Sequence, residues 1–180
     1  MKILITGGTG YLGLRLIEYF AKDKKNQIFA TSRKRNKEHT PKTEKIFLLS
    51  NKKSNIPPLK DLDLIIHAAG PNASQALQNP KKEIAESRNI TKKIIKYAIN
   101  NNVVKMIYIS TAHVYKSPLL GTLSERSKAR NTHPYAISNL VGEKEILIAN
   151  KTRNFNGVIV RLSNAFGRPV SKSNNCWSLL

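Results

Sequence analysis

Short apolar runs alternate along the chain with longer segments in which apolar residues recur every three or four positions. Six of the short runs predict buried strands, at residues 3–6, 28–31, 46–49, 64–68, 105–109 and 158–162. The longer segments predict three helices, at residues 11–22, 80–100 and 134–149. Continuous apolar strands separated by helices are typical of α/β proteins, so we expect a parallel sheet covered by helices on both faces.

The spacing of the predicted elements indicates one main domain. No internal repeat and no linker-like tract interrupts the alternation, and turn residues at 70–72 follow the fourth strand. The first predicted helix has one apolar face, formed by Leu12, Leu16, Ile17 and Phe20. We expect residues 1–170 to form a doubly wound domain and residues 171–180 to begin a second region.

Three glycines spaced three apart join the first strand to the first helix. Gly7 permits a tight turn, Gly10 allows a pyrophosphate to approach the backbone, and Gly13 allows the helix to pack closely on the strand. The helix start then offers free N–H groups to phosphates. Strand, turn and helix in this order predict a Rossmann-type dinucleotide site. Its expected cofactor contacts are Gly7, Thr9, Gly10, Tyr11, Leu12 and Gly13.

The end of the second strand distinguishes between the two nicotinamide cofactors. Proteins that bind NAD usually have an acidic residue here, which accepts hydrogen bonds from the adenosine ribose. This chain has Ser32 followed by the cations Arg33, Lys34 and Arg35. The planar fork of Arg33 suits a 2′-phosphate, so we predict NADP as cofactor and NAD as second choice. A merely solvated basic loop is the alternative.

Composition adds a strong positive charge. The 180 residues include 31 Lys and Arg against 11 Asp and Glu, a formal charge of +20. The cations fall in short groups between apolar segments, which favours solvated loops and helix faces over a nucleic-acid interface.

One cysteine, Cys176, excludes an internal disulfide, and no run approaches the length of a membrane span. We expect a soluble cytoplasmic protein without a metal site.

Several later segments carry a resemblance to a known family. Residues 67–70 read His-Ala-Ala-Gly, residues 110–115 contain a Ser-Thr pair, and Tyr135 opens a Tyr-x-x-x-Asn sequence. With the glycine turn and the segment Arg161 to Gly167, this order resembles the extended short-chain dehydrogenase/reductase family, in particular its nucleotide-sugar epimerases, dehydratases and 4-keto reductases.

The resemblance implies a role for each matching residue. Tyr135 would exchange a proton with a substrate hydroxyl or carbonyl, and Thr111 would hydrogen-bond the same oxygen. Asn164 would lie on the side of the sugar nucleotide, which would be the substrate. Further cofactor contacts would come from Ser32, Arg33, Ala68, Ala69, Gly70, Asn89 and Asn139. The two long helices, at 80–100 and 134–149, would pair in a homodimer.

Two departures from the family pattern matter. The family has Lys where this chain has Asn139, and that Lys bonds the nicotinamide ribose and favours the ionised tyrosine. Asn139 can bond a ribose hydroxyl but supplies no charge, and Lys144 points to the opposite side of the helix. We therefore expect activity biased towards carbonyl reduction.

Family members usually reach 300 residues or more, so we also expect the chain to lack most of the substrate region.

Two other functions stay open at this point. A non-catalytic dinucleotide-binding protein on the same scaffold would explain both Asn139 and the short chain. A nucleic-acid-binding role would follow from the charge of +20, but no basic motif interleaved with aromatic residues supports it. His113 and His133 are interpreted as loop residues, and Cys176 is given no role.

Overall fold

The computed structural model of the chain describes residues 1–33, 45–48, 56, 58–115, 118, 121–153 and 155–163. Within these residues, six strands form one sheet: β1 (Lys2–Thr6), β2 (Gln27–Ser32), β3 (Lys45–Leu48), β4 (Leu64–His67), β5 (Lys105–Thr111) and β6 (Gly157–Leu162). Their order across the sheet is β3-β2-β1-β4-β5-β6, and every neighbouring pair is parallel. This is the doubly wound parallel sheet that the sequence predicts.

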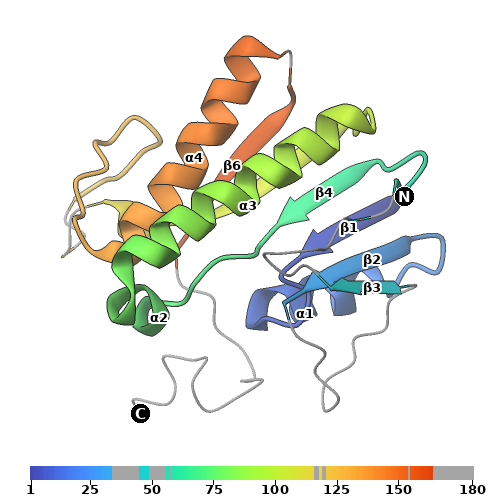
Figure 1. Cartoon of the computed structure of the whole chain (residues 1–180), viewed down its shortest axis with the longest axis horizontal. Coiled ribbons are helices and arrows are strands. Elements are labelled where there is room, and N and C mark those ends of the chain that lie inside the picture. Colours follow the sequence, from blue (N-terminus) through green and yellow to red (C-terminus); the bar gives the residue numbers. More distant parts are fainter. Residues whose placement is uncertain are drawn as a thin grey trace.

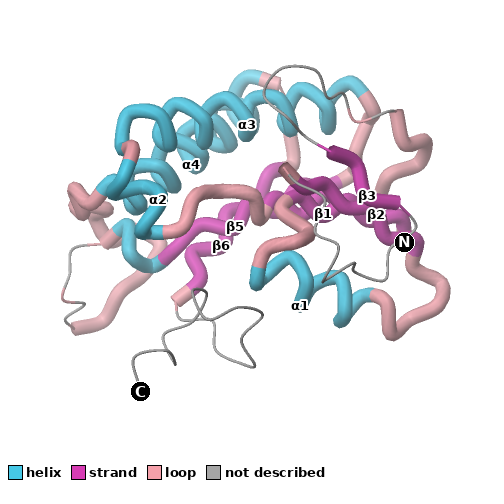
Figure 2. The backbone as a smooth tube through the Cα atoms, turned by 60° about the horizontal axis from the view of Figure 1, so that its bottom comes forward, coloured by secondary structure: helices cyan, strands magenta, loops and turns pink. Residues whose placement is uncertain are grey.

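The described part of the chain has four α-helices and one short 3₁₀ helix between the strands: α1 (Tyr11–Phe20), α2 (Ala73–Gln78), α3 (Pro80–Asn100), η1 (Ala112–Val114) and α4 (Pro134–Thr152). Figure 1 shows α3 and α4 in front of the sheet. Figure 2 shows α1 on the opposite side of the sheet from α2, α3 and α4. The described helices therefore cover both faces, as the continuous apolar strands require.

Two apolar clusters fill the spaces on either side of the sheet. Leu4, Ile65 and Met106 pack with Ile94 of α3 and Ile146 of α4 on one face. Neighbouring strand positions point to the other face because side chains alternate along a strand. There the second cluster joins the sheet to α1, and it contains Ile3, Ile5, Ile17, Ile28, Ala30 and Ile66.

The sequence predicts strands that are buried on both faces, but β6 exposes side chains on one face. In the part of the chain that the structure describes, Val158 is 41% exposed and Val160 is 37% exposed, whereas Ile159 packs against the core. The pattern is the alternation of an edge strand that has one covered face. Each helix in the described ranges is too short or too polar to cross a bilayer.

The helices differ from the sequence prediction in three places. Helix α2 lies just after the predicted turn at 70–72 and was not predicted. Its six residues depend on a capping box, in which the Asn72 side chain accepts from the Gln75 N–H and the Gln75 side chain accepts from the Asn72 N–H. Helix α1 ends two residues earlier than expected, and α4 extends to Thr152.

The first helix also buries a different set of residues. Leu14 and Ile17 are buried, whereas Leu12, Leu16 and Phe20 are half-buried. Three of the four predicted residues, Leu16, Ile17 and Phe20, still pack on the sheet, and Leu14 is buried in addition.

Candidate dinucleotide-binding and active site

The carboxyl ends of the strands form one edge of the sheet, and the predicted site lies along it. The strand order reverses at β1, so the connections after β1 and β4 run to opposite faces of the sheet. In open α/β sheets, ligands bind beside the carboxyl ends of the strands at such a reversal. Gly7 follows β1 at this point and Ala68 follows β4. A Cβ on Gly7 would lie 2.9 Å from the Ala68 carbonyl oxygen, so the two connections are in direct contact.

The glycine turn between β1 and α1 is held by backbone hydrogen bonds. Gly7 has a φ of 72°, which L side chains rarely adopt. The Gly10 N–H donates to the Gly7 carbonyl at 2.9 Å, and the Gly8 N–H donates to Thr31 of the neighbouring strand at 2.9 Å. A Cβ on Gly13 would overlap with the Gly7 carbonyl oxygen, so only glycine fits there.

The start of α1 is open to an anion. Its N-cap is Gly10, which offers no side-chain cap, and its first turn contains no acidic residue. The first amides of a helix have no acceptor within the helix, and the helix dipole adds a partial positive charge to them. The pyrophosphate of a dinucleotide fits this group of unpaired donors.

The end of β2 lies beside the glycine turn. The Ser32 hydroxyl is 2.7 Å from the Thr9 hydroxyl, which joins the end of β2 to the turn. Arg33 follows and is exposed. Lys34 and Arg35 lie outside the described residues. No carboxylate therefore stands at the described end of β2, in agreement with the sequence.

A buried hydrogen-bond chain fixes the end of β4. The Thr91 hydroxyl donates to the Ser87 carbonyl at 2.8 Å, so it must accept from His67 Nε2, 3.1 Å away. The other ring nitrogen, Nδ1, then accepts from the Thr6 hydroxyl at 2.6 Å. The Ala69 N–H donates back to the Thr6 oxygen at 3.3 Å.

Complete burial lowers the pKa of His67 to about 4. The ring is consequently neutral and protonated only at Nε2 near pH 7. His67 thus holds the Ala68–Ala69 backbone against the glycine turn.

The predicted acid–base pair lies at the carboxyl end of β5 and the start of α4. Thr111 is buried, and its hydroxyl accepts the His113 N–H at 3.1 Å. Tyr135 is half-buried, and its hydroxyl has no hydrogen-bond partner among the described residues. Among the described residues, nothing occupies that hydroxyl, and it can bond a ligand. Burial together with the nearby Glu143 and Tyr135 raises the pKa of Tyr108, which keeps that neighbouring phenol neutral.

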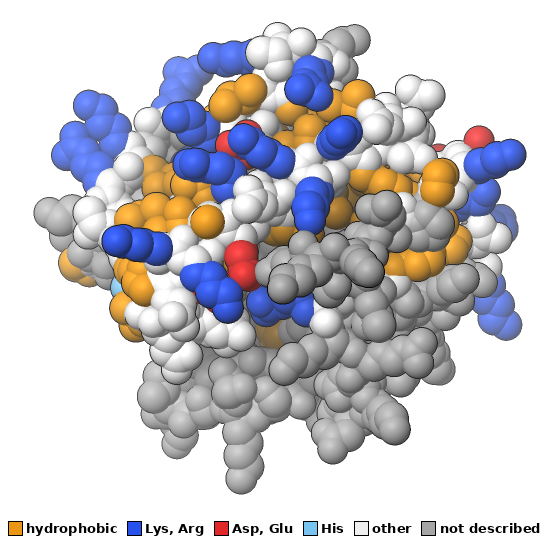
Figure 3. Space-filling view, viewed as in Figure 1, with side chains coloured by type: hydrophobic (Ala, Val, Ile, Leu, Met, Phe, Trp, Pro, Cys, Tyr) orange, Lys and Arg blue, Asp and Glu red, His pale blue; other side chains and the backbone are white. Residues whose placement is uncertain are grey.

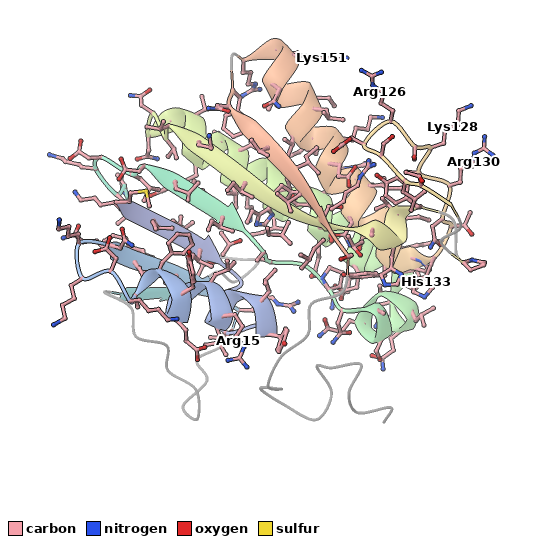
Figure 4. The ribbon with its side chains drawn as sticks, turned by 180° about the vertical axis from the view of Figure 1, so that it is seen from behind. Arg15, Arg126, Lys128, Arg130, His133 and Lys151 are labelled. Carbon is pink, nitrogen blue, oxygen red and sulfur yellow. The ribbon has the colours of Figure 1, made fainter. Side chains whose placement is uncertain are left out.

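His133 caps the helix that carries Tyr135. Its Nδ1 accepts the Tyr135 N–H at 3.2 Å, and Pro134 occupies the first helical position. Figure 4 shows His133 at this end of α4, with Arg126, Lys128 and Arg130 projecting from the preceding loop. His133 thus lies in the loop before α4, as the sequence predicts, and it also caps that helix, which the sequence analysis did not predict.

Asn139 is turned back on its own helix. Its Nδ2 donates to the Tyr135 main-chain carbonyl at 2.8 Å. The main-chain carbonyl of Asn139 accepts from the Tyr108 hydroxyl at 3.3 Å. One amide N–H and the side-chain oxygen still have capacity for a ribose hydroxyl. Lys144 is exposed, as expected for a residue on the opposite side of α4.

An ion pair that the sequence analysis missed ties α4 to β6 beneath the site. Arg161 donates from Nε and Nη2 to the two Glu143 oxygens at 2.9 and 2.7 Å, and from Nη1 to Tyr115 at 2.9 Å. Glu143 also accepts the Ser110 hydroxyl at 2.5 Å. These bonds raise the pKa of Arg161. Because Ser110 precedes Thr111, the network fixes Thr111 relative to α4.

The structure does not bring every predicted residue to this edge. Asn89 is exposed on α3, on the face away from the buried Ser87 and Thr91, so it does not join the other predicted contacts. Asn164 and Cys176 lie outside the described residues. Gly70 is exposed, and it follows Ala68 and Ala69 at the end of β4.

The cations of α3 cover its outer face. Six of its exposed residues are basic: Lys81, Lys82, Arg88, Lys92, Lys93 and Lys96. Figure 3 shows Lys and Arg dispersed among polar and apolar side chains on this side of the molecule. Arg88 and Lys92 both approach Glu145, at 3.7 and 3.8 Å. This arrangement agrees with a solvated helix face.

Comparison with known proteins identifies the family. The NAD dependent epimerase/dehydratase family matches residues 3–176, and the chain belongs to it. It is similar to the uncharacterized UDP-glucose epimerase YtcB of Bacillus subtilis, at 26% identity over 93% of this chain and 57% of that protein. It is also similar to dTDP-D-glucose 4,6-dehydratase of Dictyostelium discoideum, at 27% identity over 92% of this chain and 44% of that protein.

Solved structures agree on the fold. UDP-glucuronic acid 4-epimerase from Bacillus cereus, in complex with NAD, superposes with a TM-score of 0.80 at 21% identity, over 96% of this chain and 58% of that chain. The chain spans about half the length of the curated relatives it matches. The family description and this complex name NAD, and they give no support to the NADP preference predicted from Arg33.

Proposed function

We propose that the chain carries the cofactor-binding and acid–base portion of an NAD(P)-dependent enzyme that epimerises, dehydrates or reduces a nucleotide sugar. The observation that carries the proposal is the meeting of two features at one sheet edge. The open start of α1 lies at the carboxyl end of β1, and Thr111 and Tyr135 lie at the same edge, beside the end of β5 two strands away. Relatives whose names specify UDP- or dTDP-sugars support the substrate class.

The protein residues divide the work between binding and proton transfer. The amides at the start of α1 bind the pyrophosphate, and the contact between Gly7 and Ala68 holds the two connections beside it. Tyr135 gives a proton to the substrate carbonyl, or takes one from the hydroxyl, and Thr111 bonds the same oxygen. The bound nicotinamide supplies or accepts the hydride. Asn164 is proposed on the side of the sugar nucleotide.

The direction of reaction follows from Asn139. Oxidation needs an ionised tyrosine as base, whereas reduction needs the neutral tyrosine as acid. Asn139 carries no charge that would favour the ionised form, and its amide donates to the Tyr135 carbonyl instead. We therefore propose that reduction of a 4-keto sugar is faster than oxidation of the alcohol.

The cofactor proposed is NADP, because Arg33 is exposed at the end of β2 and no acidic residue accompanies it in the described chain. Arg33→Ala is expected to weaken NADPH binding roughly tenfold and to leave NADH binding nearly unchanged, the size of one lost charge-assisted hydrogen bond. Fluorescence titration with both cofactors measures this. Lys22→Ala, at an exposed cation after α1, is the matched control for general charge. Equal binding of both cofactors that Arg33→Ala does not change would favour NAD.

Self-association through α4, one of the two helices expected to pair in a homodimer, is part of the proposal. Helix α4 exposes Leu147 and Ile148, at 51% and 44%, and apolar side chains of this size suit a contact with a second copy. The basic outer face of α3 would repel its copy, so we place the contact on α4.

One observation favours a second candidate function, a dinucleotide-binding protein without turnover. The Asn139 amide is engaged by its own helix, and the family Lys is missing from the face that Tyr135 presents. This candidate shares the cofactor site with the first and differs only in hydride transfer. A single-turnover measurement with Tyr135→Phe as control separates the two.

A further inference from the structure

We propose that His113 is a second proton-transfer group of the candidate active site, exchanging protons with the Tyr135 hydroxyl. The inference rests on the proposed oxidoreductase function and extends it to a residue that the family resemblance does not include. It starts from the contact between the two rings, whose centroids lie 6.4 Å apart in an edge-to-face arrangement.

The backbone holds His113 in place beside Tyr135. Its N–H donates to Thr111 Oγ1 at 3.1 Å, and its carbonyl accepts from Asn131 Nδ2 at 2.7 Å. The Asn131 N–H also donates to Val114 at 3.2 Å. His113 is therefore tied by a hydrogen bond to Thr111, the other residue expected to contact the substrate oxygen.

The three described histidines differ in what their ring nitrogens do. Both nitrogens of His67 are hydrogen-bonded, and the ring is fully buried. His133 uses Nδ1 to accept the Tyr135 N–H and so to cap α4. The ring nitrogens of His113 bond to no residue in the described ranges, and the side chain is exposed. His113 is thus the histidine with both nitrogens available to Tyr135, a substrate or water.

The face of α4 that carries Tyr135 offers no cation that could stabilise an ionised Tyr135. The next two residues on its helical face are Asn139, which is neutral, and Glu143, whose charge is neutralised by Arg161. A tyrosinate formed during reduction would have no cation from that face of α4. An imidazole can return the proton, since it gains and loses one near pH 7 more readily than the other side chains.

The proton balance is simple. Reduction adds a hydride from the reduced nicotinamide to the carbonyl carbon and one proton to its oxygen. Tyr135 gives that proton, His113 returns one to the Tyr135 oxygen directly or through one water, and the imidazole takes its replacement from solvent. Oxidation of the alcohol runs the same transfers in reverse, so no other reactant is needed.

The experiment is single-turnover reduction of UDP-4-keto-6-deoxyglucose by the chain loaded with NADPH, followed by the loss of nicotinamide fluorescence. His113→Ala is expected to slow the reaction roughly tenfold to a hundredfold, at the lower end of general acid–base effects, with NADPH affinity unchanged. Added imidazole should restore the rate in His113→Ala, where it fits the vacated space. It should not restore His113→Gln, whose side chain fills that space.

Three results decide the matter. A rate in His113→Ala equal to that of the unsubstituted chain would overturn the inference and leave the proposed function intact. His133→Ala is the second control, because His133 caps the helix and supplies no proton. If His133→Ala were also slow and imidazole restored its rate as fully as that of His113→Ala, the inference would be overturned. If the unsubstituted chain and Tyr135→Phe bind NADPH but neither transfers hydride, the proposed catalytic function fails, and the role of His113 fails with it.

Discussion

Gly13→Ala is expected to lower the affinity for a nicotinamide dinucleotide at least about a hundredfold, which is close to 3 kcal/mol of binding free energy. The added Cβ would overlap with the Gly7 carbonyl oxygen and lie 2.8 Å from the Gly7 carbonyl carbon and the Gly8 Cα. All three are backbone atoms, so α1 must move away from the turn. That movement displaces the unpaired amides that we assign to the pyrophosphate. Isothermal titration with NADPH measures the loss.

Gly142→Ala is the matched control for this substitution. Gly142 is also a helical glycine, and its Cβ would overlap with the Tyr108 hydroxyl of β5, two strands away from β1 and the glycine turn. Overpacking of this kind typically costs about 1–3 kcal/mol of stability. The control should therefore lower the melting temperature while NADPH affinity stays within about tenfold. Equal loss of affinity in both variants would contradict the assignment of the pyrophosphate to α1.

Acid is expected to destabilise the chain through His67. Burial lowers the pKa of His67 to about 4 from its usual value of about 6.5. The folded state therefore binds fewer protons than the unfolded state between these two values. Stability from this group is fully present above pH 6.5 and is lost as the pH falls towards 4. The difference corresponds to roughly 3 kcal/mol in the free energy of unfolding.

Urea unfolding followed by circular dichroism between pH 7 and pH 4 measures this loss. His67→Gln is the control, because glutamine can donate to Thr91 and accept from Thr6 without titrating. Its free energy of unfolding should start lower at pH 7 and fall less steeply in acid. Parallel pH curves for the two proteins would show that His67 is not a buried neutral histidine.

The sequence contains the information for the fold because strands and long helices have regular patterns. The six apolar runs and the glycine spacing predict the sheet, and the structure and the family comparison confirm the doubly wound arrangement. Helix α2 is not predicted by apolar periodicity because it has six residues and no apolar period. Its stability comes from the cap between Asn72 and Gln75. Such side-chain caps are visible in a sequence only when they are sought residue by residue.

The candidate site is predictable where it depends on backbone and on local spacing. Asn89 shows the limit, since the helical period through Ser87 and Thr91 already places it on the outer face of α3. That signal was available in the sequence. The pairing of Glu143 with Arg161 joins residues 18 apart on different elements, and no local pattern reports it.

The histidines show how tertiary contacts decide chemistry. His67, His113 and His133 differ in burial and in the use of their ring nitrogens, although each stands near a strand end or a helix start. The cap formed by His133 has a sequence signal, because Pro134 marks the first position of a helix. The contact of His113 with Tyr135 has none, since it depends on how η1 meets α4.

The central claim is that the open start of α1 binds the pyrophosphate of a nicotinamide dinucleotide. Its most direct test is to follow the backbone amide resonances of the ¹⁵N-labelled chain by NMR during a titration with NADPH. We predict saturable shifts concentrated at residues 7–14 and at residues 68–70, where the two connections are in contact. Shifts spread over the basic outer face of α3, or no saturable shift at the glycine turn, would contradict the claim.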